Sequence, residues 1–198
     1  MRNTFRSIGI IGFIVFFMFM AVFLISCTRS QAQQYCPEDH FRIYAIGGIA
    51  SIVNYVGNRQ SVRIPPNIHG MPVRLILFET VTDIWGGIRQ VGAFEDRDLV
   101  SVTIPNTVIA IEFSAFAGNQ LNSITIPNSV RTIGRLAFRN NRLTSITIGA
   151  NVDLVTRAPG DISDWPPFDN NFHVFYNNNG RRAGTYTWNG TTWSFSAR

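Results

Sequence analysis

The chain has 198 residues, 45% of them hydrophobic, which is long enough to form a sizeable core in one domain. Its formal net charge is +5, and two of its arginines, Arg2 and Arg6, lie near the N-terminus. The remaining positive excess is too small to indicate a protein that binds nucleic acid.

The N-terminus has the pattern of an export signal. Two arginines precede an apolar run, residues 8–25, that ends just before Cys27. The junction Leu24-Ile-Ser-Cys27 resembles the lipobox of bacterial lipoproteins, which implies that residues 1–26 are a lipoprotein signal peptide and that Cys27 is diacylated. The alternative is a transmembrane anchor, because 18 apolar residues can just span a bilayer.

Residues 27–40 have no hydrophobic period, and we expect them to form a lipidated tether. With Cys27 lipidated, Cys36 is the one remaining thiol of the chain. An internal disulfide is then impossible, and the fold must be held by packing.

A block of sequence returns every 22 residues in the middle of the chain. Ser101-Val-Thr-Ile-Pro-Asn106 recurs as Ser123-Ile-Thr-Ile-Pro-Asn128 and as Ser145-Ile-Thr-Ile-Gly149. A fixed period in the twenties is the signature of a solenoid. Five columns share the spacing: Phe94/Phe116/Phe138, Leu99/Leu121/Leu143, Ile104/Ile126/Ile148, Val108/Val130/Val152 and Ile111/Ile133/Val155.

Each regular unit predicts a half-buried strand followed by a turn. In residues 123–126 the isoleucines share one face and the hydroxyls share the other. Pro127 ends the strand and Asn128 suits the turn that follows. Because one unit buries too few apolar side chains to offset the ordering of its backbone, we expect stacking of units to stabilise the fold.

Strands are also expected before the regular units. Residues 41–45 and 50–55 predict two strands of an N-terminal β cap that spans residues 41–60. The solenoid is predicted over residues 61–157, although residues 75–92 form an irregular or enlarged repeat with a loop at Trp85-Gly86-Gly87.

Residues 158–198 predict a C-terminal cap. Asp169 suits the start of a short helix that Gly180 ends, and Asn189-Gly190 predicts a hairpin turn. With a two-residue turn, Tyr186 faces Trp193 and Trp188 lies opposite Thr191. All four hairpin aromatics then share one face: Tyr186, Trp188, Trp193 and Phe195.

Residues 121–138 resemble the BspA-like leucine-rich repeat of bacterial surface proteins, whose signature is L-x-x-I-x-I-P-x-x-V-x-x-I-G-x-x-A-F. Residues 175–188 resemble the terminal segment of lipoprotein members. The resemblance implies parallel strands on one face of a solenoid, membrane attachment, and a role in adhesion or recognition without a catalytic residue. The expected fold is therefore a β-rich, leucine-rich-repeat-like solenoid of 22-residue units, with an N-terminal β cap and a C-terminal cap of a short helix plus a β-hairpin.

Two groups of residues are candidate binding sites. The first is the row of outward hydroxyls on the repeat strands, which could face a protein ligand or be merely solvated: Ser101, Thr103, Ser123, Thr125, Ser145 and Thr147. The second is the aromatic hairpin face, which we expect to cap the solenoid and which is alternatively a platform for glycans: Tyr186, Trp188 and Trp193.

Catalytic and metal sites are not expected. Cys36 and His40 are conceivable metal ligands, but His69 and His173 add no ligand-like spacing. Asp161 and Asp164 are a conceivable acid/base pair without a dry pocket. We therefore expect no metal, no cofactor and no nucleic-acid partner. The expected function is a membrane-anchored, non-catalytic binding or adhesion module in the bacterial cell envelope, lipid-anchored at the outer membrane or cell surface.

Overall fold

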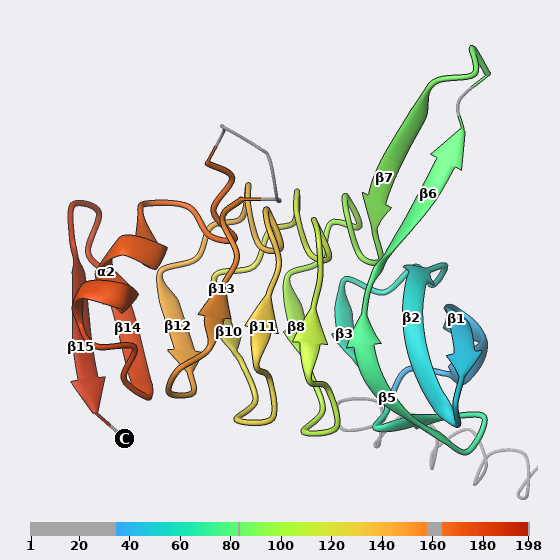
Figure 1. Ribbon diagram of the computed structural model, residues 1–198, viewed down its shortest axis with the longest axis horizontal. Coiled ribbons are helices and arrows are strands. Elements are labelled where there is room, and N and C mark those ends of the chain that lie inside the picture. The colour runs from blue at the N-terminus through green and yellow to red at the C-terminus, as the bar shows by residue number, and fades with distance from the viewer. Residues whose placement is uncertain (1–34, 83, 158–163, 198) are drawn as a thin grey trace, which may run out of the picture. The chain divides into compact units, whose positions relative to one another are not determined.

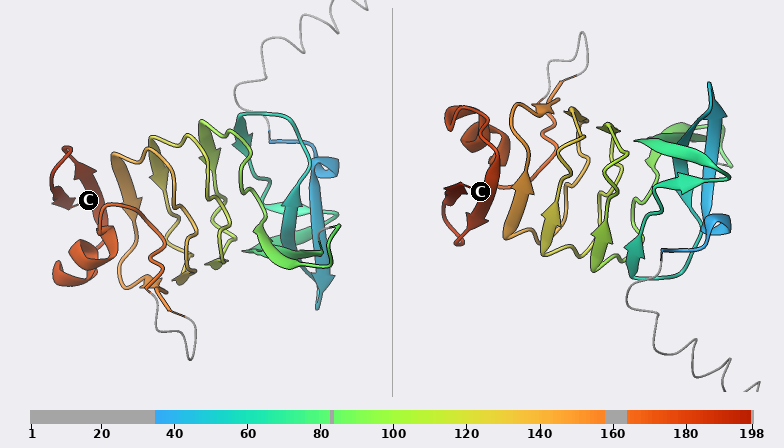
Figure 2. Two further views of the ribbon diagram at one scale, coloured as in Figure 1. Left: turned by 90° about the horizontal axis from the view of Figure 1, so that it is seen from above. Right: turned by 90° about the horizontal axis from the view of Figure 1, so that it is seen from below.

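The computed structural model describes residues 35–82, 84–157 and 164–197. They form a stack of strand-bearing units closed by strands at each end (Figures 1 and 2). The predicted signal peptide and the lipid-attachment residue Cys27 lie outside the described residues. No helix within the described part of the chain is long and apolar enough to cross a membrane.

The described elements are two short helices and fifteen strands. They are η1 (Glu38–His40), β1 (Phe41–Ile46), β2 (Ile49–Tyr55), β3 (Ser61–Arg63), β4 (Asn67–Ile68), β5 (Met71–Ile76), β6 (Phe78–Thr82), β7 (Ile88–Gly92), β8 (Ser101–Thr103), β9 (Ala110–Ile111), β10 (Ser123–Thr125), β11 (Thr132–Ile133), β12 (Ser145–Ile148), β13 (Asp153–Leu154), α2 (Phe172–Asn178), β14 (Gly184–Trp188) and β15 (Trp193–Ala197).

The 22-residue period is the register of the stack. β10 and β12 pair in parallel, with Ser123 opposite Ser145. On the other side of each unit β9 and β11 also pair in parallel, with Ala110 opposite Thr132. Each unit therefore contributes one strand to each side of the stack, and equivalent residues of paired strands lie side by side. On the first side β8 pairs with β3 in a two-stranded sheet of its own. The predicted solenoid is confirmed.

The predicted columns form the core, with two exceptions, Leu143 and Val155, which are only half-buried. Every residue is buried in the columns that begin with Phe94, Ile104 and Val108. In the Ile111 column, however, Ile133 pairs with Leu154, which is buried, while Val155 is only half-buried. The prediction of Val155 was wrong because the last unit reaches its second strand one residue earlier.

Stacked aromatic rings run through the core beyond the three predicted phenylalanines. Tyr55 stacks on Phe94 at one end, and Phe168 stacks on Phe138 at the other. The centroids of the five successive rings are 5.3, 4.9, 5.2 and 5.0 Å apart. Both caps therefore continue the packing of the repeats rather than merely covering it.

The N-terminal cap begins before the predicted boundary. β1 and β2 pair antiparallel, and β2 joins β5 in parallel, so the cap continues one sheet of the solenoid. The sequence predicts a tether through residue 40, but Cys36 is only 3% exposed and its N–H donates to the carbonyl of Arg63. Residues 35–40 belong to the folded unit because this small apolar side chain fills the core beside the cap.

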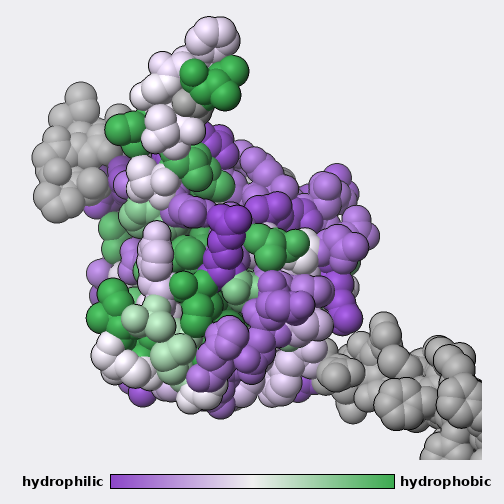
Figure 3. All heavy atoms as spheres, turned by 90° about the vertical axis from the view of Figure 1, so that its right-hand side faces the viewer, coloured by the Kyte–Doolittle hydropathy of each residue, from purple (hydrophilic) through white to green (hydrophobic). Residues whose placement is uncertain are grey.

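The irregular repeat contains a hairpin that leaves the stack. β6 and β7 pair antiparallel and project from the end of β5, with Trp85-Gly86-Gly87 in the connecting turn as predicted (Figure 1). The hairpin carries exposed hydrophobic side chains near its tip, Ile84, Trp85 and Ile88 (Figure 3).

The C-terminal cap is a helix and a hairpin, with two differences from the prediction. Helix α2 begins after Asn171, which has a left-handed backbone conformation and whose side chain does not cap the helix. Asp169 does not cap the helix as predicted, because its carboxylate accepts from the N–H of Asn140. The hairpin pairs Trp188 with Trp193 and Tyr186 with Phe195. The predicted two-residue turn was therefore wrong, because a four-residue loop connects the two strands. The Asn189 side chain stabilises this loop by accepting hydrogen bonds from the N–H groups of Thr191 and Thr192.

Candidate functional site

The predicted outward hydroxyls form two rows across the repeat strands. Ser101, Thr103, Ser123 and Thr125 on β8 and β10 are exposed, while the residue between each pair faces inward. On β12 the equivalent serine and threonine, Ser145 and Thr147, are half-buried. The structure therefore brings all six predicted residues onto one surface, although not with equal exposure.

The C-terminal hairpin extends these rows. β14 pairs antiparallel with β12, which sets Thr187 opposite Ser145 and Thr185 opposite Thr147. The hydroxyl oxygens of Thr147 and Thr185 are 3.0 Å apart. β15 then adds Ser194 and Ser196 opposite the two hairpin threonines.

At the other end β3 adds one serine and one cation. Ser61 pairs with Ser101 and Arg63 pairs with Thr103. The Arg63 guanidinium also lies 4.6 Å from the centre of the Tyr35 ring. We call this surface the hydroxyl face, and its members are Ser61, Ser101, Thr103, Ser123, Thr125, Ser145, Thr147, Thr185, Thr187, Ser194 and Ser196.

Sequence reasoning missed five of these hydroxyls. Ser61 stands 40 residues before Ser101, outside the regular period, and the two hairpin strands follow no repeat. A usable signal was present in residues 185–187 and 194–196, which repeat the hydroxyl–apolar–hydroxyl alternation of Ser123-Ile-Thr125. The alternation does not predict which strand β14 pairs with, and the structure shows that it pairs with β12.

A shallow hollow adjoins the hydroxyl face. A depression of about 520 Å³ lies at the end of β10, lined by Asn106 and by Thr125 to Ser129. Asparagine and hydroxyl groups at its rim supply donors and acceptors without any ionisable side chain. Such a surface suits hydrogen bonding to an extended partner, and it does not enclose a substrate.

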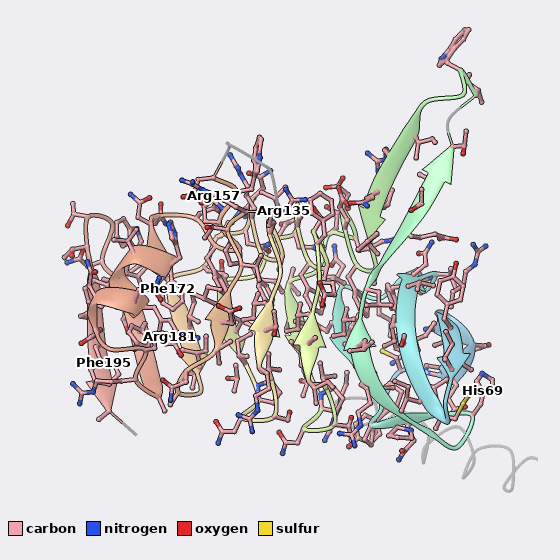
Figure 4. The ribbon with its side chains drawn as sticks, viewed as in Figure 1. His69, Arg135, Arg157, Phe172, Arg181 and Phe195 are labelled. Atoms are coloured by element: carbon pink, nitrogen blue, oxygen red, sulfur yellow. The ribbon has the colours of Figure 1, made fainter. Side chains whose placement is uncertain are left out.

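Arg135 and Arg157 lie at one edge of the stack (Figure 4). The Arg135 guanidinium lies 5.4 Å from the centre of the Phe113 ring, and that of Arg139 lies 5.6 Å from the Trp165 ring. Arg157 lies 3.8 Å from the Asp164 carboxylate. These cations are thus engaged by their own chain and are not part of the hydroxyl face.

The alternative glycan platform is largely buried. Tyr186 and Trp193 pack against Phe172 of α2, with ring centroids 5.3 and 5.0 Å away, and Trp193 is only 5% exposed (Figure 4). The Tyr186 hydroxyl donates to the carbonyl of Arg182, and burial raises the pKa of this phenol to about 12. Trp188 alone among the three remains half-buried. The open aromatic surface that a platform needs is therefore not formed.

The residues considered for metal binding and catalysis are dispersed. No group of three or more metal-ligating side chains occurs within the described ranges. Cys36 is in the core, and the Glu38 carboxylate accepts from the backbone N–H of His69. His173 lies 3.7 Å from Asp164, while Asp161 is outside the described residues.

Comparison with known protein families identifies the type of repeat. A family model described as the BspA type leucine rich repeat region matches residues 89–157 with six copies. Residues 89–157 form a BspA-type leucine-rich repeat region. The match covers β8 to β13, so the strands that carry the predicted hydroxyls are leucine-rich-repeat strands.

The solved structures and curated proteins add little to this assignment. The chain is similar to a crystal structure of a T. pallidum leucine rich repeat protein, with 20% sequence identity and a TM-score of 0.33. The similarity covers 58% of this chain and 72% of that chain. No curated protein matches the sequence.

Proposed function

We propose that this protein is a non-catalytic binding module that recognises a protein partner through the hydroxyl face. The observation that carries the proposal is the run of hydroxyls over β3 and β8, which pair with each other, and over β10, β12, β14 and β15, which form a neighbouring four-stranded sheet. Leucine-rich-repeat solenoids use extended surfaces of this kind for binding. The four paired strands, about 4.8 Å apart, alone give a surface roughly 14 Å long, and β8 and β3 extend it.

The chemistry of the face favours a protein over a glycan. Its side chains are hydroxyls, which both donate and accept hydrogen bonds, and the aromatic residues of the same strands point inward. A sugar ring would find no flat apolar surface to stack on. An extended backbone or a polar protein surface can use the exposed hydroxyls, which include those of Ser101, Thr103, Ser123 and Thr125. The shallowness of the hollow beside them predicts modest affinity.

We further propose that the module is held at the bacterial cell envelope by a lipid on Cys27. The support is the sequence Leu24-Ile-Ser-Cys27 after a basic start and an apolar run. Labelling cells with a fatty-acid analogue should mark the wild-type protein and leave Cys27→Ser unmarked. Equal labelling of both proteins would favour a transmembrane anchor instead.

The binding surface is tested with two matched double variants of the full chain. Thr103→Arg with Thr125→Arg places two bulky cations on the hydroxyl face, where both threonines are exposed. Thr80→Arg with Thr82→Arg adds the same groups to exposed positions of the projecting β6. Each protein is used to capture partners from cell-envelope and host extracts, with quantification by mass spectrometry.

A partner that uses the hydroxyl face is lost with the first variant and retained by the second. Circular dichroism should show that both variants keep the wild-type fold, because neither pair faces the core. The opposite result, retention by the first variant and loss by the second, would move the binding site to the β6–β7 hairpin.

A further inference from the structure

A small cavity lies where the last repeat meets the C-terminal hairpin, on the inner side of the sheet that bears the hydroxyl face. Its volume is about 210 Å³. Three separate segments line it: the loop before β12, residues 168–170, and the facing ends of β14 and β15. The residues that matter for its chemistry are Arg142, Leu143, Asp169, Asn170, Trp188 and Trp193.

Hydrogen bonds between these segments hold the cavity open. The N–H of Trp188 donates to the carbonyl of Thr144 at 2.8 Å, which joins the hairpin to the loop before β12. The indole Nε1 of Trp193 donates to the carbonyl of Asn170 at 3.0 Å, which joins the hairpin to the third segment. A ligand therefore meets a wall that needs no rearrangement, and this lowers the entropic cost of binding.

The cavity combines an apolar wall with hydrogen-bonding groups that have capacity to spare. The indoles of Trp188 and Trp193 are 5.4 Å apart at an interplanar angle of 47°, and the first is half-buried. The Arg142 guanidinium is exposed and forms no ion pair with any described residue. Asp169 uses its Oδ2 to accept from the N–H of Asn140, so its carboxylate retains further acceptor sites.

This combination is the one that a sugar ring requires. A pyranose has a face of C–H groups that packs on an indole and a rim of hydroxyls that need both donors and acceptors. Arg142 supplies donors, Asp169 supplies an acceptor, and the Asn170 amide supplies both. Because one cationic and one anionic side chain line the cavity, their charges offset, and an uncharged sugar fits better than an acidic or a basic one.

We propose that this cavity binds one neutral pyranose unit of a glycan, with the ring face against Trp188. A drug-sized ligand needs roughly 300–1,000 Å³, so the cavity admits a single ring rather than a chain of rings. Tyr186 takes no part because it is fully buried. The site is separate from the hydroxyl face and does not depend on the function proposed for it.

The test uses the uniformly ¹⁵N-labelled full chain in a detergent without a sugar headgroup. The indole N–H signals are assigned from single Trp→Phe variants and followed while glucose, galactose or N-acetylglucosamine is added. Mannitol is the control ligand, since it has the hydroxyls of a sugar without a ring face. At least one pyranose should shift the Trp188 signal saturably and leave Trp85 and Trp165 unmoved.

Two variants make the result specific. Arg142→Ala removes an exposed side chain whose backbone N–H bond to Leu121 is retained, so the fold is kept and the apparent Kd should rise at least threefold. Trp165→Ala removes a tryptophan outside the cavity and should leave the Kd unchanged. The proposal is overturned if no pyranose gives a saturable shift, if mannitol gives the same shift, or if Arg142→Ala binds as wild type.

Discussion

Two asparagines at the same place in successive units, the buried Asn119 and the half-buried Asn141, satisfy the backbone where each unit turns. The side chain of Asn119 accepts from the N–H groups of Arg97 and Leu99 and donates to the carbonyls of Phe94, Phe116 and Ala117. Asn141 accepts from the N–H of Leu121 and donates to three carbonyls in the same way. Backbone N–H and C=O groups at this turn are shielded from water, so leaving them unpaired would raise the free energy of the folded state.

Replacement of Asn119 with alanine should therefore destabilise the protein strongly. The change leaves the Leu99 N–H and the Phe94 carbonyl without a partner, which costs on the order of 3 kcal/mol. Asn122→Ala is the matched control, because Asn122 is exposed and its side chain is not needed by the backbone; its effect should stay within about 0.5 kcal/mol. Urea unfolding followed by circular dichroism measures both, and equal midpoints would refute the role assigned to Asn119.

The buried tyrosines make stability depend on alkaline pH. Burial raises the pKa values of Tyr55 and Tyr176, and that of Tyr186 to about 12. Below pH 10 these phenols are neutral in both the folded and the unfolded chain, so stability is fully present. As the pH rises from 10 toward 12, the Tyr186 phenol loses its proton in the unfolded chain before it does so in the folded chain, and stability falls. The raised pKa values of Tyr55 and Tyr176 act in the same direction.

The melting temperature should therefore decline across this range, and the decline should be shallower in Tyr186→Phe, which lacks one ionisable group. Thermal unfolding between pH 8 and 12 measures it. A pH dependence in Tyr186→Phe as steep as in the wild type would contradict the assignment of the raised pKa to Tyr186.

At the scale of elements, the predictions based on the 22-residue period were correct within the repeat units. They failed where other contacts determine the structure. The strand columns follow from the 22-residue spacing alone. The hairpin register does not, because a shift of two residues keeps Tyr186 and Trp188 on the same face as Trp193 and Phe195. Alternation is blind to that shift, and the side-chain hydrogen bonds of Asn189 select the longer loop.

Other differences arise from contacts that a periodic pattern does not show. Cys36 is one apolar residue in a polar stretch, which gives no period, yet its burial places residues 35–40 in the folded unit. The extension of the hydroxyl face onto β14 depends on a pairing with β12 that spans about 40 residues of sequence. The cavity at the hairpin needs three segments at once, so no single stretch of the sequence indicates it.

We expect the C-terminal hairpin to stabilise the fold through its buried tryptophan, Trp193. Trp193→Ala removes the indole that packs on Phe172 and should cost about 3–5 kcal/mol. Trp85→Ala is the matched control at the tip of the projecting hairpin, where the side chain is 85% exposed, and should change stability by less than about 0.5 kcal/mol. Chemical denaturation of both variants compares them. Similar losses would show that the C-terminal hairpin does not seal the stack.

Across the whole described unit, the caps and the repeats act as one body. One sheet of the stack is extended at its N-terminal end by β1 and β2, and the other is extended at its C-terminal end by β14 and β15. At these ends the repeat strands are paired and do not present open edges to other chains. The aromatic stack from Tyr55 to Phe168 continues through the same boundaries. The hydroxyl face is thus presented by a scaffold whose neighbouring strands cannot move independently.

The most direct test of the hydroxyl face as the binding surface is site-specific photocrosslinking in cells that make the full chain. A photoreactive phenylalanine analogue is placed at Thr125 on the face or at Thr82 on the projecting hairpin, both exposed positions. The proposal predicts a discrete crosslinked protein from position 125 and none from position 82. Crosslinks from position 82 alone would contradict the proposal and assign recognition to the hairpin.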